Sequence, residues 1–132
     1  MGLLDTLSFF SELSQSDRDA LENFCQARTL AVWENLFSEG EDANAVYILS
    51  SGRLRVFRWS AEFQDTIAIL QAEDILGEMG VFSEDKKRNA SVVAVEESEV
   101  IIILDFSIRQ LTEKYPEIYE KISQIINERS LK

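Results

Sequence analysis

The chain has 132 residues, 45% of them hydrophobic and 28% charged, which is the size and composition of one globular domain. Acidic residues outnumber basic ones by 24 to 13, and the net charge of −11 disfavours contact with nucleic acid or anionic membranes over most of the surface. The sequence has no histidine and one cysteine, which excludes histidine-based catalysis, an internal disulfide and most transition-metal sites.

The same sequence carries no sign of a membrane or secretory destination. No apolar run approaches the ~20 residues that a membrane-spanning helix needs. The first residues lack the basic segment of a secretory signal peptide. A lone cysteine is typical of a reducing compartment. We therefore expect a cytoplasmic protein that contacts no membrane and holds no metal and no resident cofactor.

Residues 1–27 carry the signals of N-terminal helices. Ser14 or Ser16 is placed to cap a helix that runs through Leu21 and Cys25. The apolar spacing within this helix predicts that Cys25 is buried, and a buried thiol is chemically inert.

The segment from residue 28 to residue 104 alternates short apolar runs with close turns. Such spacing, without intervening helices, favours an antiparallel barrel or sandwich. The continuous apolar run at 100–104 predicts a strand that is buried on both faces. The other strands that we expect lie at 46–49, 53–59, 66–70 and 91–95.

The first pair of these strands reads as a hairpin that turns at Ser50-Ser51-Gly52. In its second strand Leu54 and Val56 alternate with Arg55 and Phe57. Because successive side chains of a strand point to opposite faces, Leu54 and Val56 are expected to face the core and Phe57 to face solvent.

Residues 105–132 are helical by pattern. Asp105 or Ser107 begins a first helix, and Pro116 suits the first turn of a second one. Within that second helix an apolar stripe is formed by Ile118, Ile122, Ile125 and Ile126. The whole chain, residues 1–132, is therefore expected to be one domain with helices at both ends.

The segment 76–92 offers receptors for both halves of a ribose phosphate. Gly77 and Glu78 open a short apolar turn, and Arg88 follows ten residues after Glu78. The carboxylate of Glu78 can accept hydrogen bonds from sugar hydroxyls. Free amides at the start of a helical turn can hold a phosphate together with Arg88.

This segment resembles the phosphate-binding cassette of the cyclic nucleotide-binding domain. That family includes the bacterial catabolite activator protein, the regulatory subunit of protein kinase A and cyclic-nucleotide-gated channels. The matching positions are the Gly-Glu pair at 77–78, the small residue Gly80 and the Arg-x-Ala-x-Val group at 88–92. The combination is more specific than any one of its parts.

The resemblance extends over nearly the whole chain. Residues 37–41 followed by 46–56 look like the family's first hairpin, and Tyr115-Pro116 looks like the start of its final helix. It implies an α+β fold in which an antiparallel β-roll, jelly-roll-like and also described as a double-stranded β-helix, is flanked by N-terminal and C-terminal helices. The roll would occupy 28–104, and the C-terminal hinge and lid helices 105–132.

The resemblance also implies a role for each cassette residue. Glu78 would take the ribose 2′-hydroxyl and Arg88 the phosphate, with backbone amides completing the cradle. The ligand-binding residues implied by the cassette are Gly77, Glu78, Met79, Gly80, Arg88, Asn89 and Ala90. Relatives often carry Ala, Ser or Thr where this chain has Asn89, so the choice of base stays open. A purely structural alternative is a buried ion pair between Glu78 and Arg88.

Three residues outside the cassette complete the expected site. Val56 and Ile67 are candidates for an apolar wall under the base, although ordinary core packing explains them equally well. Arg129 lies at the polar end of the last helix, where bacterial channel relatives stack an arginine on the purine. The alternative for Arg129 is a solvated helix terminus.

We therefore expect a stand-alone receptor for cAMP or cGMP that signals through movement of its C-terminal helices. Its output would be a protein partner or a homodimer, contacted through exposed apolar residues of the last helix. The alternative is a protein-interaction module with a degenerate pocket that binds no nucleotide. An enzyme is not expected, because no second acid, nucleophile or metal cluster accompanies Glu78.

Overall fold

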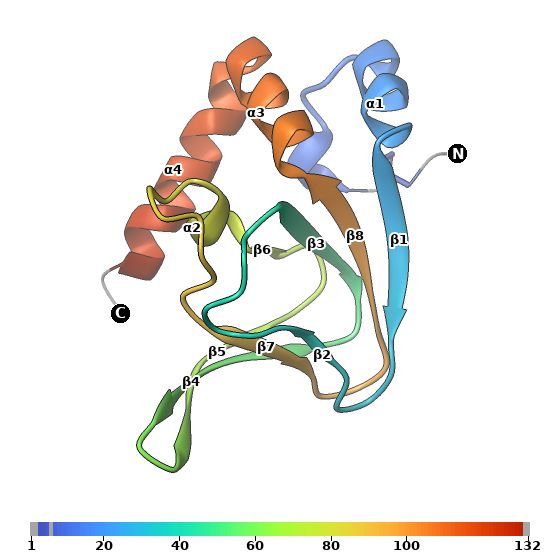
Figure 1. Ribbon diagram of the computed structural model, residues 1–132. Coiled ribbons are helices and arrows are strands. Elements are labelled where there is room, and N and C mark those ends of the chain that lie inside the picture. Colours follow the sequence, from blue (N-terminus) through green and yellow to red (C-terminus); the bar gives the residue numbers. More distant parts are fainter. Residues whose placement is uncertain (1–2, 6, 131–132) are drawn as a thin grey trace.

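The computed structural model of the chain describes residues 3–5 and 7–130, and the remaining positions of the predicted helical ends lie outside the described residues. It contains two four-stranded antiparallel sheets with helices before and after them (Figure 1). The strands are β1 (Cys25–Leu30), β2 (Asn35–Phe37), β3 (Ala45–Ser51), β4 (Leu54–Ser60), β5 (Phe63–Leu70), β6 (Ile75–Leu76), β7 (Ser91–Ala94) and β8 (Ser98–Leu104). The helices are the 3₁₀ helix η1 (Ser8–Phe10), α1 (Gln15–Glu22), α2 (Glu78–Val81), α3 (Asp105–Lys114) and α4 (Pro116–Ser130).

The strand orders β1-β8-β3-β6 and β2-β7-β4-β5 define an antiparallel β-roll, as the sequence predicts. The predicted hairpin at residues 50–52 is wrong, because β3 and β4 belong to different sheets. β3 pairs with β8 and β6, whereas β4 pairs with β5 and β7. The turn at Gly52 is therefore a corner at which the chain passes from one sheet to the other.

The N-terminal helix begins as predicted and ends earlier. Ser14 caps α1, and its hydroxyl accepts a hydrogen bond from the amide of Asp17 at 3.1 Å. The expectation that this helix includes Cys25 is wrong, because Cys25 is the first residue of β1 and pairs with Ile103. Pairing with a distant strand overrides the local helical signal. Cys25 is half-buried, and burial raises the pKa of its thiol to about 11, so it is protonated at neutral pH.

The outer face of β4 also differs from the prediction. Phe57 is buried, with 5% of its surface exposed, yet it belongs to neither core cluster. Its ring lies 4.7 Å from the guanidinium of Arg55 and 6.1 Å from the ring of Trp59. These two large side chains cover an aromatic residue that alternation alone assigns to solvent.

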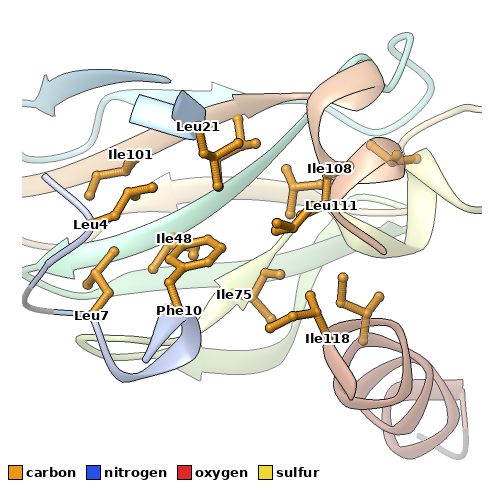
Figure 2. Close-up of a cluster of buried hydrophobic side chains, with 14 of the residues drawn as sticks. Leu4, Leu7, Phe10, Leu21, Ile48, Ile75, Ile101, Ile108, Leu111 and Ile118 are labelled. Carbon is orange, nitrogen blue, oxygen red and sulfur yellow. The ribbon is translucent and has the colours of Figure 1, made fainter. Parts of the chain in front are cut away.

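Two clusters of buried side chains form the core. The first lies between the β1-β8-β3-β6 sheet and the helices and contains Phe10, Ile48, Ile101, Ile108 and Ile118 (Figure 2). The second contains residues of both sheets, among them Leu30, Leu49, Leu54, Val92 and Val100. β8 contributes neighbouring residues to the two clusters, which confirms a strand buried on both faces at residues 100–103, whereas Leu104 at its end is 40% exposed.

The apolar stripe of α4 packs inward. Ile118 and Ile122 are 0% and 1% exposed, and Ile125 and Ile126 pack against the same core cluster. This stripe therefore attaches α4 to the roll and does not provide the exposed apolar contact that we expected for a partner. Tyr119 is the large hydrophobic residue of α4 that stays exposed, at 53%. Of the helices in the described part of the chain, none has both the length and the apolar character to cross a membrane.

The corner at Gly52 gives a test of the roll. Gly52 has φ +96°, and an added Cβ would lie 2.6 Å from the backbone oxygen of Glu97 and 2.1 Å from Ser98 Oγ. Gly40 has a similar φ of +89° with open space around it, so Gly40→Ala is the matched control. We expect Gly40→Ala to cost about 1–2 kcal/mol from φ alone. Gly52→Ala should cost a further ~1–3 kcal/mol from the steric overlap.

Urea unfolding of the two variants measures both costs. Equal losses in the two variants would contradict the close approach of Gly52 to Glu97 and Ser98.

Candidate functional site

A cavity of about 260 Å³ lies between the β2-β7-β4-β5 sheet, α2 and the end of α4. This volume is slightly below the ~300–1,000 Å³ that is typical of small-molecule sites. The structure brings every residue selected from the sequence to its wall: Val56, Ile67, Gly77, Glu78, Met79, Gly80, Arg88, Asn89, Ala90 and Arg129. Lining residues that the sequence analysis did not select include Phe37, Arg58, Asp74, Leu76, Val92 and Glu128.

A left-handed turn at Gly77 creates the floor of the cavity. Gly77 has φ +85° and precedes α2, so the chain reverses sharply between β6 and Glu78. A Cβ at this position would lie 2.7 Å from Arg88 Nη1 and 3.2 Å from the carbonyl oxygen of Ala45. Only glycine therefore allows both the turn and the close approach of Arg88.

Arg88 is held in the loop before β7 and is 4% exposed. Its Nη1 donates to the carbonyl oxygen of Gly77 at 3.0 Å, and its Nη2 donates to that of Ala45 at 2.9 Å. The guanidinium lies 4.2 Å from the ring centre of Phe37 and 5.5 Å from that of Tyr47. Nε is buried and has no hydrogen-bond partner. A donor of a buried cation is thus unused.

The charge of Arg88 survives this burial. Burial lowers the pKa of Arg88, and the neighbouring Tyr47, Glu41 and Glu78 oppose that shift. Since an arginine ordinarily loses its proton only far above neutral pH, the guanidinium remains positive. Net acidity elsewhere on the chain makes this buried cation the natural position for an anion.

Glu78, the first residue of α2, is fully buried with 0% exposure. Its Oε1 accepts a hydrogen bond from Arg129 Nη1 at 2.5 Å, and its Oε2 is buried without a partner. Burial raises the pKa of Glu78, and the positive charges of Arg129 and Arg88 oppose this shift, Arg129 more strongly. The direct Glu78–Arg88 pair that we considered as a structural alternative is replaced by a Glu78–Arg129 pair.

Arg129 reaches the cavity from the last turn of α4, which runs past α2 (Figure 1). Besides its bond to Glu78, its Nη2 donates to the carbonyl oxygen of Ile75 at 2.7 Å. The guanidinium therefore contacts both the first residue of β6 and the first residue of α2. Its stacking on a base stays a prediction.

Two residues of the β4-β5 pair, Ile67 and Arg58, help to form the wall of the cavity, and the sequence analysis did not select Arg58. Val56 pairs with Ala68 and Phe57 with Thr66, so Ile67 is the extra residue of a β-bulge. Arg58 lies two residues after Val56 and therefore shares its face of β4, a signal that the alternation already contained. Arg58 Nε donates to the carbonyl oxygen of Asn89 at 2.9 Å and ties this strand to the cassette.

The polar groups of the cavity are suited to binding a small polar ligand. Within residues 3–5 and 7–130, no group of three or more Cys, Asp or Glu side chains is arranged to hold a metal ion. A buried cation with an unused donor and a buried carboxylate with an unused acceptor line one cavity. Such a pair is complementary to a ligand that carries both an anionic group and a hydroxyl.

Comparison with known proteins gives a consistent result. The sequence profile described as "Cyclic nucleotide-binding domain" matches residues 27–115. The chain is 31% identical over 105 residues to the "Anaerobic regulatory protein" of Bacillus subtilis, covering 78% of this chain and 44% of that protein. It is 27% identical over 121 residues to the "Cyclic AMP receptor protein" of Thermus thermophilus, covering 91% of this chain and 56% of that protein. The chain thus spans about half the length of these relatives.

A solved structure, that of the Thermus thermophilus catabolite activator protein, has the same fold. It superposes with a TM-score of 0.78 at 25% identity and covers 92% of this chain and 57% of that one.

The burial of Glu78 predicts a pH-dependent stability. Because its pKa is raised above the ordinary 4.5, the folded protein keeps a proton that the unfolded chain has already released. The unfolding free energy of the wild type therefore falls as pH rises through the interval between the two pKa values. Glu78→Gln removes this loss. As pH rises, the unfolding free energy of Glu78→Gln relative to wild type should therefore increase, by about 1.4 kcal/mol for each pH unit by which the folded-state pKa of Glu78 exceeds its unfolded-state pKa.

Urea unfolding without ligand between about pH 4 and pH 8 measures this difference, because this range begins near the ordinary glutamate pKa of 4.5. Glu128→Gln is the control, because it removes an exposed carboxylate from the rim of the same cavity. A stability difference between wild type and Glu78→Gln that does not change with pH would contradict the raised pKa of the buried Glu78 carboxyl.

Proposed function

The chain belongs to the cyclic nucleotide-binding domain family, and we propose that it is a receptor for a cyclic nucleotide, cAMP or cGMP. One observation carries the proposal. Arg88 Nε and Glu78 Oε2 are a buried donor and a buried acceptor, both without partners, on side chains that line one cavity. A polar atom buried in this way costs about 1–3 kcal/mol, which a suitable ligand would recover.

Arg88 would hold the phosphate of the ligand. A guanidinium presents donors in a planar fork, and two terminal nitrogens already fixed to backbone carbonyls leave it with little freedom to move. Because the Arg88 side chain is already held in place, it would lose little conformational entropy when a ligand binds. Gly77 and Gly80 let neighbouring parts of the protein pack closely around the cassette, because a Cβ at Gly77 would lie 2.7 Å from Arg88 Nη1 and a Cβ at Gly80 would lie 2.7 Å from the Cβ of Ala43.

Glu78 would hold the sugar of the ligand. Its free Oε2 can accept a hydrogen bond from a ribose hydroxyl, and an ionised carboxylate is the stronger acceptor. The base would lie against Val56 and Ile67, with Arg58 at the edge of the same wall. Because Asn89 offers both donor and acceptor groups, either purine is compatible with this wall.

The signal would travel through the C-terminal helices. Arg129 connects α4 to Glu78, and Arg109 of α3 donates to the carbonyl oxygen of Val81 at the end of α2 at 2.5 Å. Both helices thus contact the cassette directly, so a ligand that moves the cassette would alter their positions. A protein partner or a second copy of the chain would receive this movement.

One observation favours the alternative of a protein-interaction module without nucleotide. Both terminal nitrogens of Arg88 donate to carbonyls of the protein itself, as they would in a purely structural role. Fully buried unpartnered atoms on Arg88 and Glu78 weigh against this alternative, because a structural pocket gains nothing from leaving them unpaired.

Calorimetric titration with cAMP and with cGMP tests the proposal. We expect saturable binding of at least one nucleotide, and Arg88→Ala should weaken it about 30- to 1,000-fold, because roughly 2–4 kcal/mol of charge-assisted contacts are lost. Lys87→Ala is the matched control, since it removes the neighbouring cation, whose side chain is 51% exposed and pairs with Asp42. Arg88→Lys keeps the charge without the fork and should also bind more weakly.

The outcomes separate the two functions. Unchanged binding by Arg88→Ala would contradict the assignment of the phosphate site. Failure of the folded wild type to bind either nucleotide would favour the interaction module.

A further inference from the structure

A second cavity, of about 160 Å³, lies between α1 and α3, at the end of the molecule that is at the top in Figure 1. It shares no lining residue with the cavity beside α2. Its lining includes Leu21 and Leu111, which belong to the first core cluster (Figure 2). Other lining residues are exposed, so the cavity is a groove open to solvent: Ala20, Phe24, Gln110 and Lys114. We call it the α1–α3 groove.

The α1–α3 groove contains a buried hydroxyl group. Ser107 lies on its wall and is 5% exposed. Within the part of the chain that the structure describes, the buried Oγ of Ser107 has no hydrogen-bond partner. A buried hydroxyl without a partner loses its bonds to water and gains none in return. A polar group that enters the groove and pairs with Ser107 would therefore remove this cost.

An exposed aromatic pair borders the same groove. Phe24 and Phe106 are 55% and 47% exposed, and their ring centres lie 5.8 Å apart with the ring planes at 80°. Phe24 lines the groove, and Phe106 precedes Ser107 in α3. Large apolar side chains that are exposed together are typical of a contact surface. Rings in this position can also form edge-to-face contacts with an aromatic ligand.

A polar cluster lies on the wall of the groove, and negative charge lies next to it. Lys114 Nζ donates to Asp17 Oδ1 at 2.9 Å, and the hydroxyl of Tyr115 donates to Asp17 Oδ2. The charge of Lys114 is thus matched by that of Asp17, whereas the neighbouring Glu113 and Glu117 are exposed. Together with the net charge of −11, this arrangement attracts cationic segments and repels anionic ones.

The size and polarity of the groove select one kind of occupant. A cavity of ~150 Å³ is enough for one benzene ring, whereas drug-sized ligands need ~300–1,000 Å³. A phenol is such a ring with a hydroxyl that both donates and accepts hydrogen bonds, as the hydroxyl of Ser107 does. Because the groove is open, the far side of the ring can remain attached to a polypeptide. Tyrosine is the side chain that meets these conditions.

We propose that the α1–α3 groove is a docking site for a segment of a partner protein that inserts one tyrosine ring beside Ser107 and carries lysine or arginine next to that tyrosine. This docking site goes beyond the proposed receptor function and does not depend on nucleotide binding. It places a partner on α1 and α3, whereas the sequence pointed to α4.

NMR titration of the whole chain with two sets of probes tests this docking site. The first set is p-cresol and toluene, which differ only by the hydroxyl. The second set is pentapeptides with blocked ends, in which a central tyrosine or phenylalanine has two lysines or two glutamates on each side. Both sets are applied to wild type, to Ser107→Ala and to Ala20→Phe, which fills the groove.

Two matched controls accompany these variants. Ser16→Ala and Ala27→Phe make the same changes at exposed residues that do not line the groove. Thermal unfolding of every variant measures whether it is folded. The comparison of probes on the wild type needs no variant at all.

We expect saturable shifts at the amides of residues 20–24 and 107–114. The wild type and Ser16→Ala should bind p-cresol about 2- to 10-fold more tightly than toluene, the range of one neutral hydrogen bond. Ser107→Ala should abolish this preference. Ala20→Phe should bind neither probe, while Ala27→Phe binds both as the wild type does.

The peptides test the charge of the partner. The peptide with tyrosine and lysines should bind the wild type at least about 2-fold more tightly than its phenylalanine or glutamate counterparts. The difference between lysine and glutamate peptides should shrink in about 1 M salt, because salt screens exposed charges.

Four outcomes would overturn the docking site. They are shifts that are absent from the groove or confined to the cassette, a preference for p-cresol that Ser107→Ala retains, binding that Ala20→Phe retains, and equal binding of the lysine and glutamate peptides. None of these outcomes bears on the receptor function, because titration with cAMP and cGMP reports on a cavity with different lining residues.

Discussion

The structure depends on placing one carboxylate where no water reaches it. Glu78 has no exposed surface, and a buried negative charge is tolerated only when positive charge and hydrogen bonds surround it. Arg129 comes to Glu78 from the last helix, and Arg88 acts on it from the loop before β7. The positions of the cassette, the roll and α4 are therefore linked, because moving any one of them leaves a charge without its partner.

The roll provides the rigid frame that this arrangement requires. Ala45 of β3 accepts a hydrogen bond from Arg88, and the backbone of Arg88 exchanges hydrogen bonds with Gly40 and Glu41 in the loop before β3. The cassette is thereby attached to the sheet on one side. On the other side Arg109 of α3 attaches to the end of α2. The cavity thus lies between the sheet and two helices, and Arg109 and Arg129 provide the polar contacts of these helices with the cassette.

Sequence reasoning was reliable where a short segment determines its own conformation. The cap at Ser14 and the helix start at Pro116 are local, and the structure places them as predicted. The cassette is also one short segment, and its selected residues line one cavity. It failed where distant strands decide the outcome. Cys25 joins β1 because β8 offers it a partner, and Phe57 is buried because Arg55 and Trp59 cover it. The Glu78–Arg129 pair could not be predicted from the sequence for the same reason, because no local pattern indicates which cation will pair with a buried carboxylate.

The pairing of the first strand with the last has a consequence for how the protein is made. Cys25 pairs with Ile103 and Leu30 with Ser98, so β1 lacks its neighbour until 68 to 78 further residues have been synthesised. Long-range pairing of this kind slows folding and leaves strand edges open in the meantime. A nascent chain that has not yet released β8 from the ribosome exposes both β1 and β3. The emergence of one late strand is thus the step that converts the growing chain into a closed roll.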